Sequence, residues 1–368
     1  MLARRAVAFF GVAAMALSQA GAAYAQTACS AGSDHFLNPF NKASAHHRPI
    51  GTGARYATST DRTTRDWLKA AHFTLNIGAP WGVTMIDTVE TDPIVTVRGV
   101  APCGRVSGLP VNIRLPVAGL ITRIETGASG CQDGNIVVHD KVSDEMHHLR
   151  QYNYNNGSPS AGQYRLVDTR GLGHGTRLGQ RLGTSASGVA APFGLLRGHE
   201  TNTPGFAINH AMQMVLPRVA GCKIMLGRTI VLPATDRDGT ATNTGNNTGS
   251  IPYGGLLALP PTVNLTSLGL SEPGLRLAEA IRNYGIYAVD GGGCNAGAVR
   301  TDQEVSEPIA RLLRADIKKF HRFVRLVTNN DVLGSPVAGG GEALAPNCAF
   351  DALPPPPPPP PPPPTNNT

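Results

Sequence analysis

The sequence predicts a mainly β fold: a disulfide-bonded, β-sandwich or jelly-roll-like body with two helices near its C-terminus. Three observations support this prediction. Glycine and proline account for 43 and 30 of the 368 residues, which favours many short elements joined by ordered loops. Short apolar runs separated by turn residues follow one another over most of the chain. Two segments near the end carry apolar residues at helical spacing.

Both ends of the chain are expected to lie outside the folded domain. The first 25 residues resemble a secretory signal, with a basic start, a short apolar stretch and a small-x-small cleavage site at Ala23-Tyr24-Ala25. The run from Pro354 to Pro364 must form an extended polyproline II rod. We therefore expect a signal peptide at 1–25, a single β-rich domain at 26–350 and a polyproline tail at 351–368. The protein is expected to be secreted or periplasmic, with no membrane span in the mature chain.

Helices are expected in three places. A short one runs from Asp61 to Ala71, with the aspartate as N-cap. A second begins after Ser271, which can cap it, and stops at Tyr284-Gly285. A third runs from about Gln303 to Phe320, with apolar residues on one face.

Strands are expected where apolar residues alternate or cluster over four to six positions. The clearest are Ile94–Val97, Val111–Leu115, Asn135–His139 with Glu145–Tyr154 as its hairpin partner, and Ile286–Asp290. Residues 168–205 are rich in glycine and predict a long ordered loop, a kind of segment that often carries function.

The charge of the chain argues against nucleic acid as its main partner. The formal net charge is +7, and it becomes 7 − 2 = +5 when Arg4 and Arg5 leave with the signal peptide. Basic residues are scattered rather than clustered, and aromatic residues make up only 5%. A solvated basic surface fits this pattern better than a nucleic-acid interface.

Six cysteines remain after the signal peptide, in a compartment expected to be oxidising. None of them forms a CxxC pair, so a zinc site or a redox motif is not expected. Six cysteines allow 15 pairings, which the spacing does not resolve. Among them we favour Cys103–Cys131, Cys29–Cys348 and Cys222–Cys294.

Familiar catalytic and cofactor motifs are absent. The segment Gly183-Thr-Ser185-Ala-Ser187 fails the nucleophile-elbow pattern at its fifth position. There is no HExxH, no Walker A motif and no Rossmann fingerprint, so no particular cofactor is indicated. Histidine is enriched over about 70 residues, but no pair has the spacing of a familiar metal site, and no metal is predicted.

Several short motifs occur in an order that resembles a family of uncharacterised secreted bacterial proteins, over residues 35–295. The motifs are Asn38-Pro39-Phe40, Ile136-Val137-Val138-His139-Asp140, Ser185-Ala186-Ser187-Gly188, Gly194-Leu195-Leu196-Arg197, Ile208-Asn209-His210-Ala211, and Tyr284-Gly285 with Asp290. The resemblance implies a twisted β-sandwich or jelly-roll-like body, similar to polysaccharide-active or carbohydrate-binding proteins. It implies no established activity.

The candidate site residues are groups that transfer protons or bind anions. Histidine titrates near neutral pH, and carboxylates in pairs cleave glycosidic bonds. The candidate catalytic residues are His174, His210, Asp140 and Glu200, with Asp168 and Asp290 as further acids. The arginines Arg170, Arg177 and Arg197 are candidate contacts to a carboxylated sugar, the first two flanking His174 in the glycine-rich segment.

Two functions fit these residues. One is a carbohydrate-active enzyme, a polysaccharide hydrolase or lyase centred on residues 139–210. The other is a non-catalytic glycan-binding or cell-surface module, with the proline tail as its spacer. Polysaccharide is the expected partner in both cases.

Overall fold

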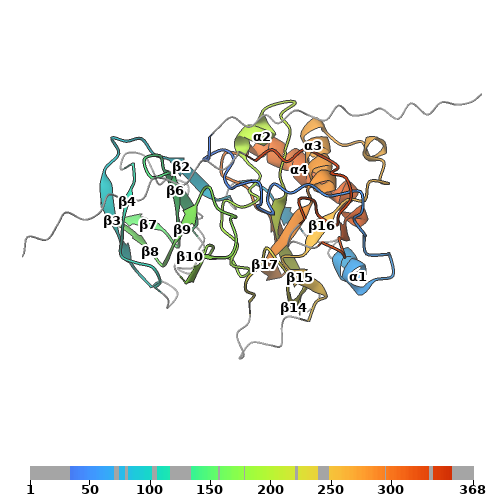
Figure 1. Ribbon diagram of the computed structural model, residues 1–368, viewed down its shortest axis with the longest axis horizontal. Coiled ribbons are helices and arrows are strands. Elements are labelled where there is room, and N and C mark those ends of the chain that lie inside the picture. Colours follow the sequence, from blue (N-terminus) through green and yellow to red (C-terminus); the bar gives the residue numbers. More distant parts are fainter. Residues whose placement is uncertain are drawn as a thin grey trace, which may run out of the picture.

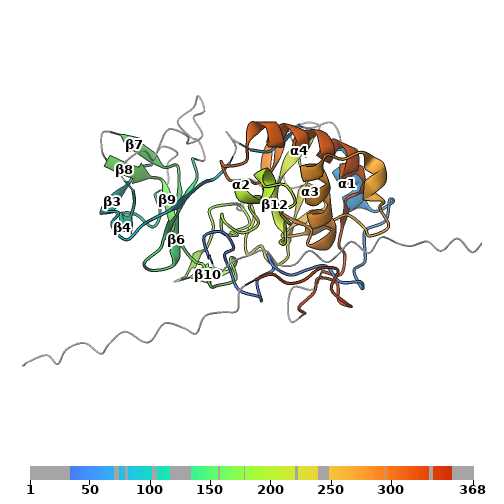
Figure 2. The same ribbon diagram turned by 90° about the horizontal axis from the view of Figure 1, so that it is seen from above.

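The computed structural model describes residues 34–69, 74–78, 82–101, 106–116, 134–155, 158–177, 179–219, 223–238, 248–294, 296–330 and 335–349. The predicted signal peptide and the proline tail lie outside these residues. The chain forms two parts that lie side by side, which we term the β lobe and the α/β lobe (Figure 1). The same two parts are seen in the view from above (Figure 2).

The α/β lobe is built on a mixed seven-stranded sheet of order β1-β18-β12-β17-β16-β19, with β13 paired to β12. Its strands are β1 (Thr74–Asn76), β12 (Met212–Val219), β13 (Lys223–Ile224), β16 (Leu256–Ala258), β17 (Ile286–Cys294), β18 (Ala296–Val299) and β19 (Arg325–Leu326). Its helices are α1 (Arg62–Lys69), α2 (Gly198–Asn202), α3 (Glu272–Asn283) and α4 (Glu307–Phe320), with 3₁₀ turns η3 (Leu265–Leu268) and η4 (His321–Phe323). The pair β14 (Leu226–Ile230) and β15 (Ile251–Tyr253) lies beside this sheet.

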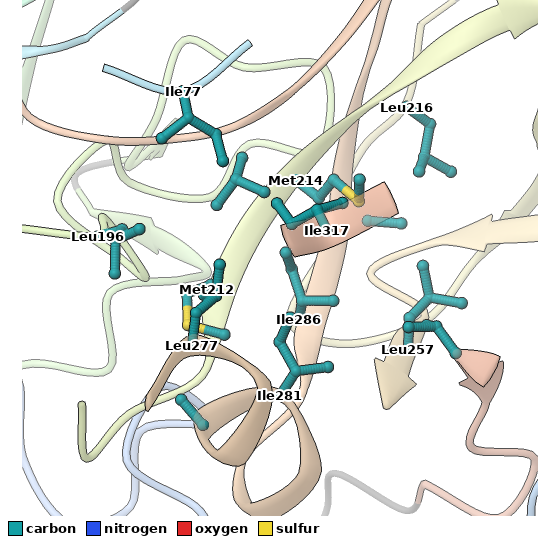
Figure 3. Packing of buried hydrophobic residues seen from close by; sticks show 14 of the residues in the cluster. Ile77, Leu196, Met212, Met214, Leu216, Leu257, Leu277, Ile281, Ile286 and Ile317 are labelled. Atoms are coloured by element: carbon teal, nitrogen blue, oxygen red, sulfur yellow. The ribbon is translucent and has the colours of Figure 1, made fainter. Parts of the chain in front are cut away.

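Helices α3 and α4 cover one face of this sheet. The contact residues are Leu277 and Ile281 of α3, Ile317 of α4, and Met212, Met214, Leu257 and Ile286 of the sheet (Figure 3). Burying each such side chain contributes about 1.5–3 kcal/mol relative to leaving it exposed. This first core therefore holds β12 and β17 in place, and these two strands contribute residues to the candidate site.

The β lobe consists of two four-stranded sheets of order β2-β5-β6-β9 and β4-β3-β8-β7. The strands are β2 (Thr84–Asp87), β3 (Ile94–Gly99), β4 (Val111–Arg114), β5 (Ile136–Asp140), β6 (Glu145–Arg150), β7 (Asn153–Asn155), β8 (Ser158–Ala161) and β9 (Gln163–Asp168). A short hairpin of β10 (Thr176–Arg177) and β11 (Gln180–Arg181) follows. Ile136 and Val138 of β5 pack with Val97 and Ile113 of the other sheet in a shared core.

A further core joins the two lobes. Val137 of β5 faces away from the core of the β lobe and packs in one cluster with Tyr287 and Val289 of β17. The N-terminal segment contributes Phe40 and Ile50 to the same cluster. Strand β5 is therefore covered on both faces, which explains why it is a continuous apolar run rather than an alternating one.

The elements expected from the sequence are largely confirmed. Ser271 accepts a hydrogen bond from the Gly274 N–H as the N-cap of α3, and Gly285 follows the helix with a φ of 84°. Helix α4 begins at Glu307 rather than near Gln303, because Pro308 suits the first turn. The two helices cover the seven-stranded sheet, an element that the sequence did not reveal.

Neither of the two cysteines among the described residues, Cys294 and Cys348, is a free thiol. Cys29, Cys103, Cys131 and Cys222 lie outside the described residues, so the three predicted pairings stay predictions. None of the helices in the described ranges combines the length and the apolar character needed to cross a bilayer.

Candidate functional site

A small pocket lies where the two lobes meet, with about 20 Å³ of enclosed space beneath a mouth that opens to solvent. The lining residues are Asn135, His148, Arg150, Thr184, Ser185, Val189, Ala191, Gln213, Asp290 and Arg300. Eight of these ten residues are polar or charged, whereas most of the surrounding interface is apolar. A concave site with several convergent polar groups is the usual form of a small-ligand site.

The side chain of Asp290 reaches the pocket because of a β-bulge in β17. Residues of β12 and β17 pair in parallel, with Met214 opposite Ala288 but Val215 opposite Asp290, so Val289 is an extra residue. In a regular strand, with Val289 paired to Val215, alternation would place Asp290 on the side of Ala288, in the core beneath the helices. With the bulge, Asp290 lies on the same face as Val215 and Gln213. The bulge thus turns a carboxylate out of the core and into the pocket.

Three neighbours hold the Asp290 carboxylate in place. Its Oδ1 accepts from the Gly291 N–H at 2.8 Å, and its Oδ2 accepts from the Ala186 N–H at 3.3 Å. The Arg300 Nη2 lies 3.6 Å from Oδ2, and both side chains are less than one-fifth exposed. The pocket therefore contains one carboxylate and one guanidinium that face each other on the wall of the α/β lobe.

A tight loop over residues 183–189 forms a second wall. The Gly183 N–H donates to the Gly188 carbonyl at 2.9 Å, and Gly188 has a φ of 75°. A Cβ on Gly183 would lie 1.6 Å from the Val189 carbonyl oxygen, so only glycine fits there. The Ser187 N–H donates to the Val289 carbonyl at 3.0 Å, which attaches the loop to the bulge. The loop places Thr184 and Ser185 in the pocket.

The β lobe supplies the third wall from β6 and the residue before β5. His147 and His148 point to opposite faces of β6, as their adjacency predicts: His147 contacts the Tyr164 hydroxyl and His148 contacts Asn135. His148 Nε2 lies 3.0 Å from the Asn135 Oδ1, and both side chains are buried. Arg150, two residues after His148, lies on the same face and lines the pocket.

Three of the residues predicted as a site come together elsewhere, in a buried group of side chains. The Glu200 Oε1 lies 2.8 Å from the His210 Nε2, and the Arg197 Nε lies 2.7 Å from the Asp302 Oδ2. We term His46, His47, Arg197, Glu200, His210 and Asp302 the histidine cluster. Arg197, Glu200 and His210 are only 5–6% exposed, so none of them offers a surface to a polysaccharide.

Two charge states follow from the partners within the histidine cluster. Both ring nitrogens of His210 face acceptors, Glu200 and the Ala211 carbonyl. Despite burial, these partners raise the pKa of His210 and lower that of Glu200, which favours an imidazolium–carboxylate pair. His46 is different: its Nδ1 accepts from the Gly194 N–H at 3.0 Å. Burial lowers the pKa of His46 well below its ordinary value, and lowers that of His47 to about 3.

The other predicted residues are separated from this cluster and from the pocket lining. Burial and the charge of Arg48 lower the pKa of His174 to about 4, and its ring packs edge-on against Phe193. Asp140 lies 3.3 Å from the Arg114 guanidinium. Arg177 pairs with Glu145 at 2.5 Å, and Arg170 lies 3.7 Å from Asp168 and 4.0 Å from Asp144. Arg170 and Arg177 are thus each paired with carboxylates, and the predicted arrangement of Arg170, His174 and Arg177 around one ligand stays a prediction.

Most of the residues that line the pocket were not predicted from the sequence as site residues. Asp290 was considered as an acid, and His148 is one of the locally enriched histidines. No motif in the sequence pointed to Asn135, Gln213 or Arg300 as site residues. One signal was available: an acidic residue followed by three glycines, Gly291 to Gly293, at the end of an apolar strand. Glycine inside a strand often marks a bulge or a close approach of another backbone.

Among the residues that the structure describes, no group of three or more His, Cys, Asp or Glu side chains could hold a metal ion. Comparison of the chain with protein-family models, curated proteins and solved structures finds no match.

Proposed function

We propose that this is an exported glycan-binding protein that contacts a sugar unit of a polysaccharide at the mouth of the pocket between its lobes. The observation that carries the proposal is the composition of the lining. Amide, hydroxyl, carboxylate and guanidinium groups converge there from three separate segments. Sugar hydroxyls both donate and accept hydrogen bonds, and a lining of this kind offers them both kinds of partner.

Other ligand classes fit the pocket less well. Apart from His148 the lining has no aromatic ring, so a base or another flat apolar ligand would find no stacking surface. The histidine cluster is an alternative location, but its carboxylates and guanidinium are buried and paired with one another. The pocket is one place among the described residues where polar side chains of both lobes face open space.

Polysaccharide cleavage in the same pocket is a second candidate function. It is favoured by His148, whose ring is oriented by Asn135 on the wall opposite the Asp290–Arg300 pair. A single carboxylate lines the pocket, whereas glycoside hydrolysis ordinarily uses two. Elimination fits better: a base takes the proton from the carbon that carries the carboxylate, a C=C bond forms as the glycosidic C–O bond breaks, and the leaving oxygen receives a proton.

Export and the finer fold description belong to the same proposal. The segment 1–25 would direct secretion and be removed. The six remaining cysteines would pair in the oxidising compartment beyond the membrane. The two four-stranded sheets of the β lobe, which share a core, would be the predicted sandwich.

Binding and cleavage are tested on oxidised protein that begins at Gln26. Isothermal titration with neutral and acidic oligosaccharides should detect binding of at least one. Asp290→Asn should weaken that binding about tenfold or more while the thermal transition stays in place, and Glu307→Gln, an exposed change on α4, should have no effect. Absence of binding to every sugar would refute the proposal. Release of unsaturated oligosaccharides, followed by ultraviolet absorbance, would add the second function.

A further inference from the structure

We propose that residues 34–40 form a pH-sensitive strap, which is fastened across both lobes while His139 carries a proton and is released when that proton is lost. This inference is independent of the proposed function, because it involves neither the pocket nor a sugar. The strap is the first described part of the chain and lies between the lobes (Figure 1). It ends on a network of charged groups of the β lobe that belongs neither to the pocket nor to the histidine cluster.

The centre of this network is His139, which lies between two carboxylates. Its Nδ1 lies 2.8 Å from the Asp87 Oδ1, its Nε2 lies 3.0 Å from the Asp144 Oδ1, and the imidazole is only 5% exposed. A neutral imidazole has one N–H and can donate to one of these acids, whereas an imidazolium donates to both. Although burial opposes the charge, the hydrogen bonds with Asp144 and Asp87 raise the pKa of His139. The network is therefore complete only while His139 is protonated.

The strap reaches this network through His35 and Phe36. The His35 Nδ1 lies 2.6 Å from the second oxygen of Asp144, Oδ2. The Phe36 ring stacks on the His139 imidazole, with centroids 5.9 Å apart and an interplanar angle of 25°. From the α/β lobe, the guanidinium carbon of Arg197 lies 4.9 Å from the centre of the same ring, and the Arg197 Nη1 donates to the Phe36 carbonyl at 2.8 Å. One phenyl ring thus contacts a cationic group of each lobe.

Loss of the His139 proton weakens both attachments of the strap to the β lobe. One ring nitrogen would then face a carboxylate with its lone pair, which leaves a partly buried acid without its donor. Asp144 is the acid in a turn, with a φ of 55°, and it is also the residue that holds His35. Phe36 loses the cation over its ring at the same time. The attachment is therefore fully present below the ordinary pKa of histidine and is lost as the pH rises through the raised pKa of His139.

Two further cations border the network. The Lys141 Nζ lies 3.2 Å from the Asp87 Oδ2, and the Arg170 Nε lies 4.0 Å from Asp144 and 3.7 Å from Asp168. Lysine, arginine and aspartate ordinarily keep their charges between pH 6 and pH 9. These groups therefore set the background field of the network and do not switch with it.

Two other histidines lie nearby. His147, on the neighbouring strand β6, is kept neutral because burial lowers its pKa. For its bond to Asp144, His35 needs a single N–H, which a neutral ring also supplies. His139 is the histidine of this network that needs both of its N–H groups, and it is therefore the switch.

The test is hydrogen exchange, followed by mass spectrometry, on oxidised protein that begins at Gln26. In the strap the Leu37 and Asn38 amides donate to the Asp34 carbonyl at 3.1 and 2.9 Å, so a fastened strap should slow their exchange. After correction for the chemical effect of pH on exchange, we expect their protection to fall about tenfold or more between pH 6 and pH 9. Helix α3 should keep its protection in the same samples, which distinguishes release of the strap from unfolding.

Two substitutions should change the result in opposite directions. His139→Gln carries no charge at any pH, so the strap should show low protection at both pH values. Asp87→Asn leaves one carboxylate for the single N–H of a neutral imidazole, and the new amide can donate to the other ring nitrogen. This variant should therefore show more protection than wild type at pH 9. His147→Gln is the matched control and should keep the change seen in wild type.

Each contrary result overturns a defined part of the inference. Equal protection of the wild-type strap at pH 6 and pH 9 would refute it. A pH-dependent loss that persists in His139→Gln would show that His139 is not the switch. If that variant fails to fold, Asp87→Asn decides, and protection no higher than wild type at pH 9 would contradict the role of His139. Loss of protection in α3 together with the strap would show that the strap has no separate release. None of these outcomes affects the proposed function.

Discussion

The histidine cluster and the pocket contain the same kinds of side chain but differ in access. Each has a histidine, an arginine and a carboxylate brought together from distant segments. In the cluster, Arg197, Glu200 and His210 are 5–6% exposed and bond to one another or to backbone groups. In the pocket, Asp290 and Arg300 are 18% and 16% exposed and border an open volume. Residue type alone therefore does not separate a structural network from a ligand site, and the two regions should respond differently to substitution.

The largest expected effect is on the buried ion pair of the cluster. Arg197→Met leaves Asp302, which is 1% exposed, as a buried charge without its partner. We expect the free energy of unfolding to fall by about 3–5 kcal/mol in urea titrations. The control is Arg314→Met, which breaks an exposed pair with Glu307 and should cost at most about 1 kcal/mol. Equal losses of unfolding free energy in the two variants would contradict the conclusion that the histidine cluster stabilises the fold.

A smaller effect is expected in the loop that borders the pocket. Gly183→Ala places a methyl group against the Val189 carbonyl, so the backbone of the loop must move. Overpacking of this kind costs about 1–3 kcal/mol, and the displacement should also abolish sugar binding. Gly179→Ala is the control: its φ of 75° is unfavourable for a side chain, but no heavy atom lies within 4 Å of the added carbon. The Gly179→Ala protein should be less stable than wild type but should still bind the sugar. Loss of binding in both variants would contradict the role of the 183–189 loop in the pocket.

The pH dependence of stability should come from the cluster. The pKa of His47 is about 3 in the folded protein and about 6.5 in the unfolded chain. Between pH 6.5 and 3, His47 is therefore protonated in the unfolded chain but neutral in the folded protein. The free energy of unfolding that is present above pH 6.5 is lost as the pH falls toward 3. Each such histidine contributes a loss of about 1.4 kcal/mol per pH unit. His210 and Glu200, whose pair is already charged, add little between pH 6 and 5.

The measurement is urea unfolding of wild type and His47→Gln at pH 6 and pH 5. The variant should lose about 1.4 kcal/mol less over this interval, because one proton uptake is removed. An identical pH dependence in the two proteins would show that His47 is protonated in the folded state, contrary to its burial beside His46 and Phe40.

The smallest effect on stability is expected from the pocket acid. Asp290→Asn keeps the shape of the side chain and loses the charge opposite Arg300. Because both groups are partly exposed, the free energy of unfolding should change by less than about 1 kcal/mol. The same variant should nevertheless weaken sugar binding about tenfold or more. A destabilisation as large as that of Arg197→Met would show that Asp290 stabilises the fold as the histidine cluster does, and would contradict its assignment to a ligand site.

Local structure was predictable because its causes are local. The capping serine of α3, the glycine after it and the buried run of β5 are each decided by a few neighbouring residues. The pairing of β12 with β17 was not, because strands distant in sequence carry no mark of their partner or register. For this reason the helices were placed correctly along the chain, while the sheet beneath them was missed.

The same distinction explains the outcome for the site. The glycine-rich segment was expected to carry function, and its part around Ser185 does line the pocket. His174, in the same segment, packs against Phe193 instead. Glu200 and His210, predicted as catalytic residues, form a buried pair, and His46 of the N-terminal segment packs on His210 with ring centroids 4.4 Å apart. No pattern in the sequence indicates that contact.

The bulge at Val289 lets β17 carry one residue more than its neighbour while the acid stays opposite Val215. Met214 pairs with Ala288 and Val215 with Asp290, so the extra residue is accommodated between these two pairs. A chain shortened by Val289 would still place Asp290 opposite Val215, now in an unbroken pairing. It would lose the Val289 carbonyl that accepts the Ser187 N–H at 3.0 Å and the side chain that packs in one cluster with Tyr287. The added residue therefore joins the loop to the strand, and the loop would lose this attachment before the acid changed sides.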